Sequence, residues 1–121
     1  MFAAHHKIDN LIAITDWNGQ QIDGQVESVM GLGELKAKWE AFGWSVIVAD
    51  GHNMAEILNT YKEAHKLAGN GKPVMILFRT DMGHGVDFMS GTHKWHGKAP
   101  SAEQAEQALA QLKETLGDFK M

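Results

Sequence analysis

Residues 11–24, LIAITDWNGQQIDG, contain an apolar run that ends abruptly in polar residues, and this pattern indicates the class of fold. The strand predicted over residues 11–15 is apolar on both faces, as expected of a parallel strand that helices cover on both sides. Residues 16–24 then bring together two acids, one Asn, two Gln and two Gly. We therefore expect a polar loop at the carboxyl end of a strand, which is where ligands bind in parallel sheets.

This polar loop has two interpretations. Its carboxylate and amide oxygens suit a hard cation such as Mg²⁺. Asn-Gly and Asp-Gly are also strong turn dipeptides, so a tight turn explains the same residues. The local chemistry taken alone favours the turn.

Two further apolar runs, residues 44–49 and 74–78, predict strands of the same kind. Helical patterns separate the three strands, and a long loop and a last helix follow them. Alternation of this kind implies a parallel sheet with right-handed crossovers. We predict an α/β fold, a three-layer α/β/α arrangement around a parallel sheet.

Three amphipathic helices are predicted between and after the strands. The first ends at Gly43, the glycine expected just beyond a helix C-terminus. The second begins at Asn53 and the third at Ser101, each with Glu or Gln three residues later, as in a capping box. The apolar residues expected to be buried are Leu32, Leu35, Trp39 and Phe42 in the first helix, Met54, Ile57, Leu58, Tyr61 and Leu67 in the second, and Ala105, Ala108, Leu109, Leu112 and Leu116 in the third.

Composition excludes several classes of function. The chain has 121 residues and a formal net charge of −4, which provides no basic surface for nucleic acid or for an acidic membrane. It has no cysteine, which excludes thiolate chemistry and is compatible with a cytoplasmic location. No apolar run is long enough to span a membrane, and the N-terminus lacks the layout of a signal peptide.

Residues 79–100 are predicted to form a long irregular segment, and such segments in compact domains usually carry function. His93-x-x-His96 resembles a pair of metal ligands, but zinc sites need a third ligand at a defined spacing. A phosphate contact, an acid/base group or a plain surface histidine explains these residues more simply. Gly83-His84-Gly85 resembles a phosphate-binding loop only faintly, because a lone G-x-G is common.

Several motifs, taken in order, resemble one family. The stretches 3–14 and 16–24 are followed by KWEAFGW (residues 38–44), Asp50-Gly51-His52, residues 83–89 and WHGKAP (residues 95–100). In this order and at these intervals they resemble the thiamine-pyrophosphate domain of transketolase, in particular the N-terminal subunit of split bacterial and archaeal transketolases. An acetolactate-type or deoxyxylulose-phosphate-type relative is the weaker alternative, because WHGKAP favours transketolase.

The resemblance implies roles for four residues. Asn18 matches the side-chain ligand of a Mg²⁺ that joins the cofactor's pyrophosphate to the protein, and Gln20 matches the position whose backbone carbonyl completes that metal site. Ile22 matches a residue that packs against the cofactor. His96 matches a catalytic histidine near the pyrophosphate and the substrate channel. The implied cofactors are thiamine pyrophosphate and Mg²⁺, and the implied substrates are sugar phosphates of the pentose phosphate pathway.

The chain also departs from the family pattern. The family's cofactor motif begins with Gly-Asp-Gly, well before the matched Asn, and its Asp is the charged Mg²⁺ ligand. Asn18 has seventeen residues ahead of it, and no Gly-Asp-Gly occurs in the chain. Residues 1–121 are therefore expected to form a single partial domain, a truncated thiamine-pyrophosphate-binding fold that lacks its N-terminal half. A neutral Asn and a carbonyl make a weak Mg²⁺ site, so we expect the isolated chain to be inactive.

Three hypotheses follow. In the first, the chain completes its site in an oligomer, with a chain that carries the missing N-terminal half and with the transketolase C-terminal subunit. In the second, the chain is an inactive fragment derived from a transketolase. In the third, it is a non-catalytic assembly module that uses the sheet edge where a missing strand should pair.

Overall fold

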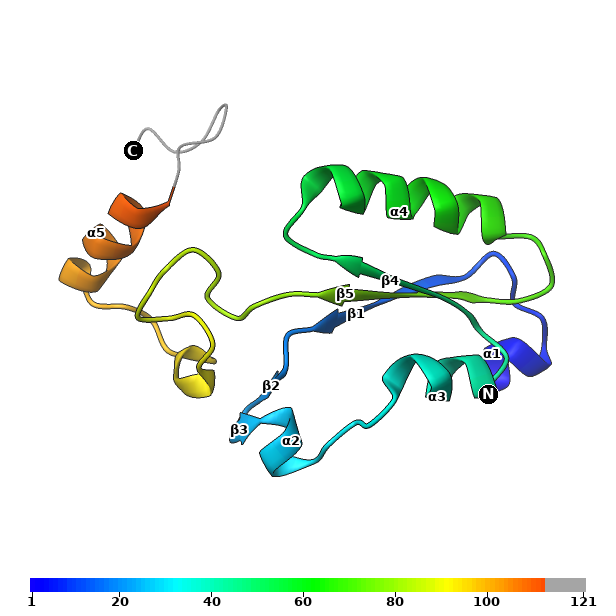
Figure 1. Cartoon of the computed structure of the whole chain (residues 1–121), viewed down its shortest axis with the longest axis horizontal. Helices are drawn as coiled ribbons and strands as arrows, with labels where there is room; N and C mark the ends of the chain where they lie inside the picture. Colours follow the sequence, from blue (N-terminus) through cyan, green and yellow to red (C-terminus); the bar gives the residue numbers. More distant parts are fainter. Residues whose placement is uncertain (113–121) are drawn as a thin grey trace.

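The central element of the fold is a three-stranded parallel sheet, seen in a computed structural model that describes residues 1–112 (Figure 1). β5 pairs in parallel with both neighbours, and Ile76 lies beside Ile14 on one side and Ile47 on the other. The last strand within residues 1–112 is therefore the central one. In spatial order the strands are β1 (Ile12–Trp17), β5 (Val74–Arg79) and β4 (Ser45–Asp50).

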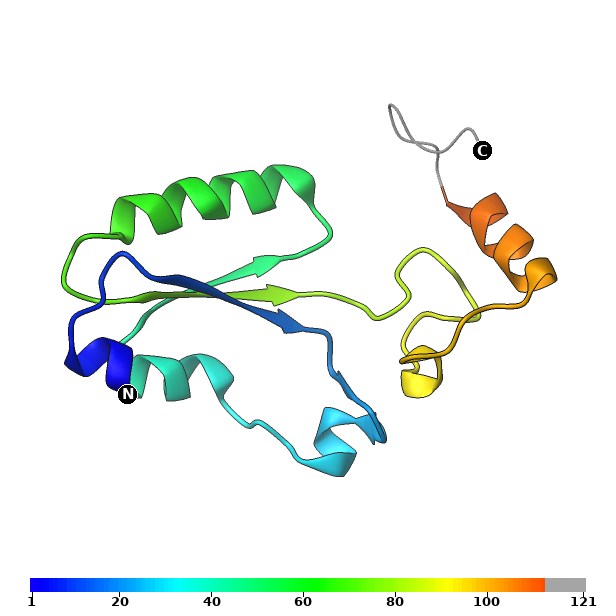
Figure 2. The ribbon, with the colours of Figure 1, turned by 180° about the vertical axis from the view of Figure 1, so that it is seen from behind.

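Helices cover both faces of the sheet, with α4 (Met54–Leu67) on one side and α1 (Phe2–His5) and α3 (Leu35–Ala41) on the other (Figures 1 and 2). Ala64 of α4 is fully buried against the sheet, and its small side chain lets the helix approach the strands closely. Trp44 is buried on the opposite face, packed edge-to-face on Trp39. The predicted α/β class and the three-layer arrangement are confirmed.

Several side chains expected to be buried are exposed. α4 contacts the sheet through Ile57, Ala64 and Leu67, so the neighbouring stripe of the helix faces solvent. The last predicted helix does not pack on the sheet, so most of its apolar side chains are not covered by other residues of the range 1–112. Leu116 lies outside the described residues. The expected burial is wrong for Phe42, Met54, Leu58, Tyr61, Leu109 and Leu112.

Helix capping follows the sequence, with one difference. Ser101 and Gln104 form the full capping box at the start of α5 (Ala102–Gln111). Asn53 caps α4 by accepting the backbone N–H of Glu56 at 3.1 Å. The Glu56 carboxylate, however, accepts the backbone N–H of Asp50 at the end of β4, so it ties the helix to the strand instead of closing the box.

Two further parts lie beyond the carboxyl ends of the strands. After β1 come the short hairpin β2 (Gln20–Gln21) and β3 (Gly24–Gln25) and the single turn α2 (Val26–Val29). After β5 comes an irregular segment, residues 80–101, where the sequence predicts residues 79–100; it contains one 3₁₀ turn, η1 (His93–Trp95). Within residues 1–112, no helix has the length and apolar character needed to cross a membrane.

The irregular segment is folded by its own contacts. Val86 is buried within it, and the backbone N–H of Gly91 donates to the carbonyl of Met82 at 3.1 Å. α5 packs on this segment, because the Gln111 amide and Asp87 exchange two hydrogen bonds of 2.8 Å. The segment and α5 therefore form a unit beside the sheet (Figure 1).

Candidate functional site

Residues from two loops meet in one cavity beyond the carboxyl ends of β1 and β5. One wall comes from the β2–β3 hairpin, and the other comes from the segment that follows β5. Figure 1 shows both segments beyond the same end of the sheet. The four residues singled out in the sequence share this cavity, although they come from distant parts of the chain. The cavity has a volume of about 420 Å³ and is lined by Asn18, Gln20, Gln21, Ile22, Asp23, Met82 and His96.

Asn18 shapes the first wall through an Asx turn. Its side-chain Oδ1 accepts the backbone N–H of Gln20 at 2.9 Å, and Gly19 takes the left-handed φ of +72°. An amide oxygen has two lone pairs, so Asn18 Oδ1 keeps one for a ligand. The loop is therefore a tight turn and also a wall of the cavity.

Asp16 joins the ends of β1 and β5 and orients the Asn18 side chain. Its carboxylate accepts a hydrogen bond from the Thr80 hydroxyl and another, at 3.2 Å, from Asn18 Nδ2. The amide nitrogen of Asn18 is thus turned toward Asp16. The amide oxygen is left for Gln20 and for the cavity.

Gln20 connects the two walls. Its Nε2 donates to the backbone carbonyl of Gly91 at 3.3 Å, across from the hairpin to the segment after β5. Its Oε1 is buried and has no hydrogen-bond partner within the described residues. A buried amide oxygen without a donor is unfavourable, so this atom is an unused acceptor in a residue that lines the cavity.

His96 sits at the end of η1, which the neighbouring Trp95 anchors. The Trp95 Nε1–H donates to the carbonyl of Phe88 at 2.8 Å, and the Trp95 and Phe88 ring centres are 5.5 Å apart. Lys98 Nζ lies 4.8 Å from the Trp95 ring centre. The imidazole of His96 is exposed and lines the cavity, where a ligand can reach it.

Sequence reasoning missed part of the site. Nothing in the sequence marks Met82 as a lining residue. The contact between Asp16 and Thr80 has a usable signal, because both residues come at the carboxyl ends of strands that prove to be neighbours. His84 contacts His52 and Asp81 and does not line the cavity, so Gly83-His84-Gly85 is not part of its wall.

Comparison with known proteins decides the family. The sequence profile described as "Transketolase, thiamine diphosphate binding domain" matches residues 1–119. The chain belongs to the transketolase family. The resemblance drawn from the motifs is therefore confirmed.

Curated relatives include components of split transketolases. One subunit of the apulose-4-phosphate transketolase of Phocaeicola vulgatus is 39% identical over 116 residues, which cover 96% of this chain and 41% of that protein. The 6-deoxy-6-sulfo-D-fructose transketolase subunit SqwG of a Clostridium species is 41% identical over 112 residues, 93% of this chain and 40% of that protein. The chain thus spans about two fifths of the length of these transketolase relatives.

Solved transketolase structures share the fold. The transketolase of Campylobacter jejuni superposes with a TM-score of 0.79 at 32% identity, covering 91% of this chain and 17% of that one. A Pichia stipitis transketolase in complex with sedoheptulose 7-phosphate gives a TM-score of 0.78 at 29% identity, covering 88% of this chain and 16% of that one. These similarities confirm that the sheet and its helices belong to a transketolase fold.

Proposed function

We propose that this chain contributes part of a thiamine-diphosphate site to a transketolase that transfers a two-carbon ketol unit between sugar phosphates. One observation carries the proposal. Asn18, Gln20, Ile22 and His96, matched one by one to the family's cofactor site, all line the same cavity of about 420 Å³. A concave site of this size, lined by both polar and apolar side chains, suits a small organic ligand.

Asn18 and Gln20 are the residues that would hold a Mg²⁺ ion, Asn18 through Oδ1 and Gln20 through its backbone carbonyl. Magnesium prefers oxygen ligands and is usually bound by few protein groups together with phosphates. The unpartnered Gln20 Oε1 adds polar oxygen to the same wall, so the donor set fits this ion. Both ligands are neutral, however, so we expect the chain alone to bind Mg²⁺ and the cofactor weakly.

Ile22 and His96 supply the other contacts that the cofactor needs. Ile22 is 68% exposed at the cavity, and its apolar surface would pack against the cofactor and exclude water from it. The His96 imidazole would hold a proton on a ring nitrogen and donate it in a hydrogen bond to a phosphate oxygen of the cofactor or substrate. Once bound, thiamine diphosphate supplies the electron sink that stabilises the carbanion of the transferred group.

The complete enzyme requires partners. We propose that a transketolase C-terminal subunit supplies the activating glutamate, and that residues carrying Gly-Asp-Gly supply the charged Mg²⁺ ligand in a cytoplasmic oligomer. Relatives that are themselves named as one subunit of a transketolase support a partner subunit. Their names, with apulose 4-phosphate and 6-deoxy-6-sulfo-D-fructose, also support a ketose substrate.

Reconstitution tests this proposal. Thiamine diphosphate and Mg²⁺ are titrated into the purified chain, alone and together with a segment that carries Gly-Asp-Gly and a transketolase C-terminal subunit. We expect ketol transfer from a ketose phosphate only in the complete mixture. Turnover by the chain alone would contradict the need for partners, and a complete mixture that forms a complex without turnover would contradict the catalytic role.

A non-catalytic assembly module is the second candidate, and the exposed apolar surface favours it. One edge of β1 has no paired strand within the described residues, and Ile14 on that strand is 49% exposed. Met54, Leu58 and Tyr61 of α4 are exposed as well. A stable oligomer in light scattering, together with no affinity for thiamine diphosphate, would support this function over the first.

A further inference from the structure

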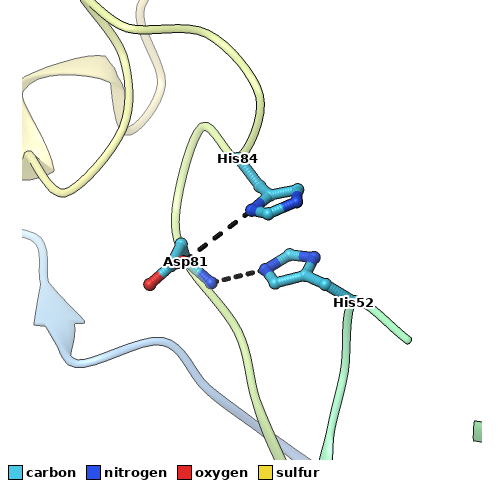
Figure 3. A group of neighbouring side chains, drawn as sticks. All are labelled: His52, Asp81 and His84. Carbon is cyan, nitrogen blue, oxygen red and sulfur yellow. Dashed lines mark hydrogen bonds and ion pairs between the residues drawn. The ribbon is translucent and has the colours of Figure 1, made fainter. Parts of the chain in front are cut away.

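We propose that His52, Asp81 and His84 form a binding site for a divalent transition-metal ion such as Zn²⁺ (Figure 3). One ligand atom from each residue lies within 4.8 Å of the other two. Within the described residues this is the one group of three His, Asp or Glu side chains close enough to share an ion. None of the three lines the cavity at Asn18, so the proposal does not rest on the thiamine-diphosphate site.

The backbone holds the two loops of this site together. His52 follows β4, and the other two residues follow β5. The backbone N–H of Gly51 donates to the carbonyl of Arg79 at 2.8 Å. A Cβ atom at Gly51 would lie 2.4 Å from Thr80 Cγ2, so only glycine permits this close approach. The approach places His52 beside Asp81, whose backbone N–H donates to His52 Nε2 at 2.7 Å.

The turn after β5 brings His84 back over His52. Gly83 has a φ of +71°, and a Cβ atom there would lie 2.6 Å from the Met89 backbone, so this glycine is required as well. As a result the His52 and His84 rings stack with their centres 3.6 Å apart and an interplanar angle of 10°. His84 Nδ1 lies 3.7 Å from Asp81 Oδ2.

Two imidazoles and one carboxylate are a donor set for Zn²⁺, Co²⁺ or Ni²⁺, and imidazole ligands do not suit Mg²⁺. With Zn–N bonds of about 2.0–2.1 Å, ligand atoms in a tetrahedral site lie about 3.4 Å apart. The side chains must therefore close slightly around the ion. Parallel rings cannot both direct in-plane lone pairs at one ion, so binding turns one ring out of the stack.

The exposure of the cluster makes this adjustment inexpensive. All three residues are exposed, so a ring that leaves the stack turns into solvent, and water can replace His52 as the partner of the Asp81 backbone N–H. An open fourth position would remain for water. The bound ion would fasten the segment after β5, which carries His96, to the turn after β4.

Titration with Zn²⁺ tests the site. The purified chain, labelled with ¹⁵N, receives Zn²⁺ while the imidazole resonances are followed by NMR and the affinity is measured by calorimetry. We expect one ion per chain, with shifts at His52 and His84 and none with Mg²⁺. A hundredfold excess over Kd should also raise the Tm, by on the order of 10 °C.

Matched variants locate the binding. His52→Gln and His84→Gln should each weaken Zn²⁺ binding at least about tenfold, the loss seen even for outer-shell partners of metal sites. His65→Gln on α4 and the pair His5→Gln, His6→Gln should leave affinity unchanged. All these side chains are exposed, and circular dichroism checks that each variant folds. Absence of shifts at His52 and His84, or Zn²⁺ binding that survives their joint replacement, would overturn the proposal.

Discussion

β5 and β1 are parallel neighbours of six residues each, yet only β5 is buried along its length. Residues 74–78 of β5 are at most 8% exposed, whereas Ile14 of β1 is 49% exposed. β5 pairs on both edges and is covered on both faces, while β1 pairs on one edge and α4 lies mainly over β4 and β5. An apolar run thus predicts a strand, but the neighbours of that strand decide its burial.

The two strands also differ in their contributions to stability and to the candidate site. β5 organises the core, and β1 leads directly into Asn18 and the cavity. An edge strand, and not the buried central one, therefore leads into the candidate site.

The largest expected effect contrasts the two strands directly. Ile76→Ala should lower the free energy of unfolding by about 2–5 kcal/mol, because it empties a fully buried position. Ile14→Ala, at the half-exposed neighbouring position, should cost about 1 kcal/mol or less. Urea denaturation of both variants measures the difference. Equal losses of unfolding free energy would mean that β1 is covered in solution, which would contradict the difference in burial between the two strands.

We also predict that the segment after β5 is closely packed around Gly83. Gly83 and Gly69 both have positive φ, but a Cβ atom meets the Met89 backbone at Gly83 and open space at Gly69. Gly69→Ala should cost about 1–2 kcal/mol from backbone strain, and Gly83→Ala about 2–4 kcal/mol because overpacking is added. Denaturation curves compare them. If Gly83→Ala lowers the free energy of unfolding no more than Gly69→Ala does, the segment after β5 is loosely packed and adjusts to the added methyl group.

The smallest expected effect concerns the helix caps. Asn53→Ala should lower global stability by about 1 kcal/mol, because α4 packs on the sheet. Ser101→Ala should reduce hydrogen-exchange protection in α5 and leave protection of the sheet unchanged, because α5 packs on the segment after β5 instead. A loss of protection in β5 in the Ser101 variant would show that the two regions are coupled.

Much of the fold could be predicted from the sequence. Three apolar runs and the helix signals at Gly43, Asn53 and Ser101 gave the strands, the helices and the layers. The strand order could not be predicted, because nothing in residues 74–78 shows that they form the centre of the sheet. For the same reason the exposure of Ile14 and of the α4 stripe was not foreseen.

The candidate site was predictable only in part. The motifs named Asn18, Gln20, Ile22 and His96, and these four residues share one cavity. Their roles toward a cofactor remain a prediction. Met82 and the cluster at His84 could not be predicted, because their positions depend on how the segment after β5 folds back on itself. That folding leaves no periodic pattern in the sequence.

We propose above all that the cavity beyond β1 and β5 is part of a thiamine-diphosphate site. NMR detects even weak binding, so thiamine diphosphate with Mg²⁺ is titrated into the ¹⁵N-labelled chain while the backbone amides are followed. We expect shifts concentrated at Asn18, Gln20, Ile22 and His96. Asn18→Ala should reduce these shifts several-fold, whereas Asn59→Ala, on the exposed side of α4, should not. Shifts that lie elsewhere, or that persist unchanged in the Asn18 variant, would contradict the proposed cofactor site.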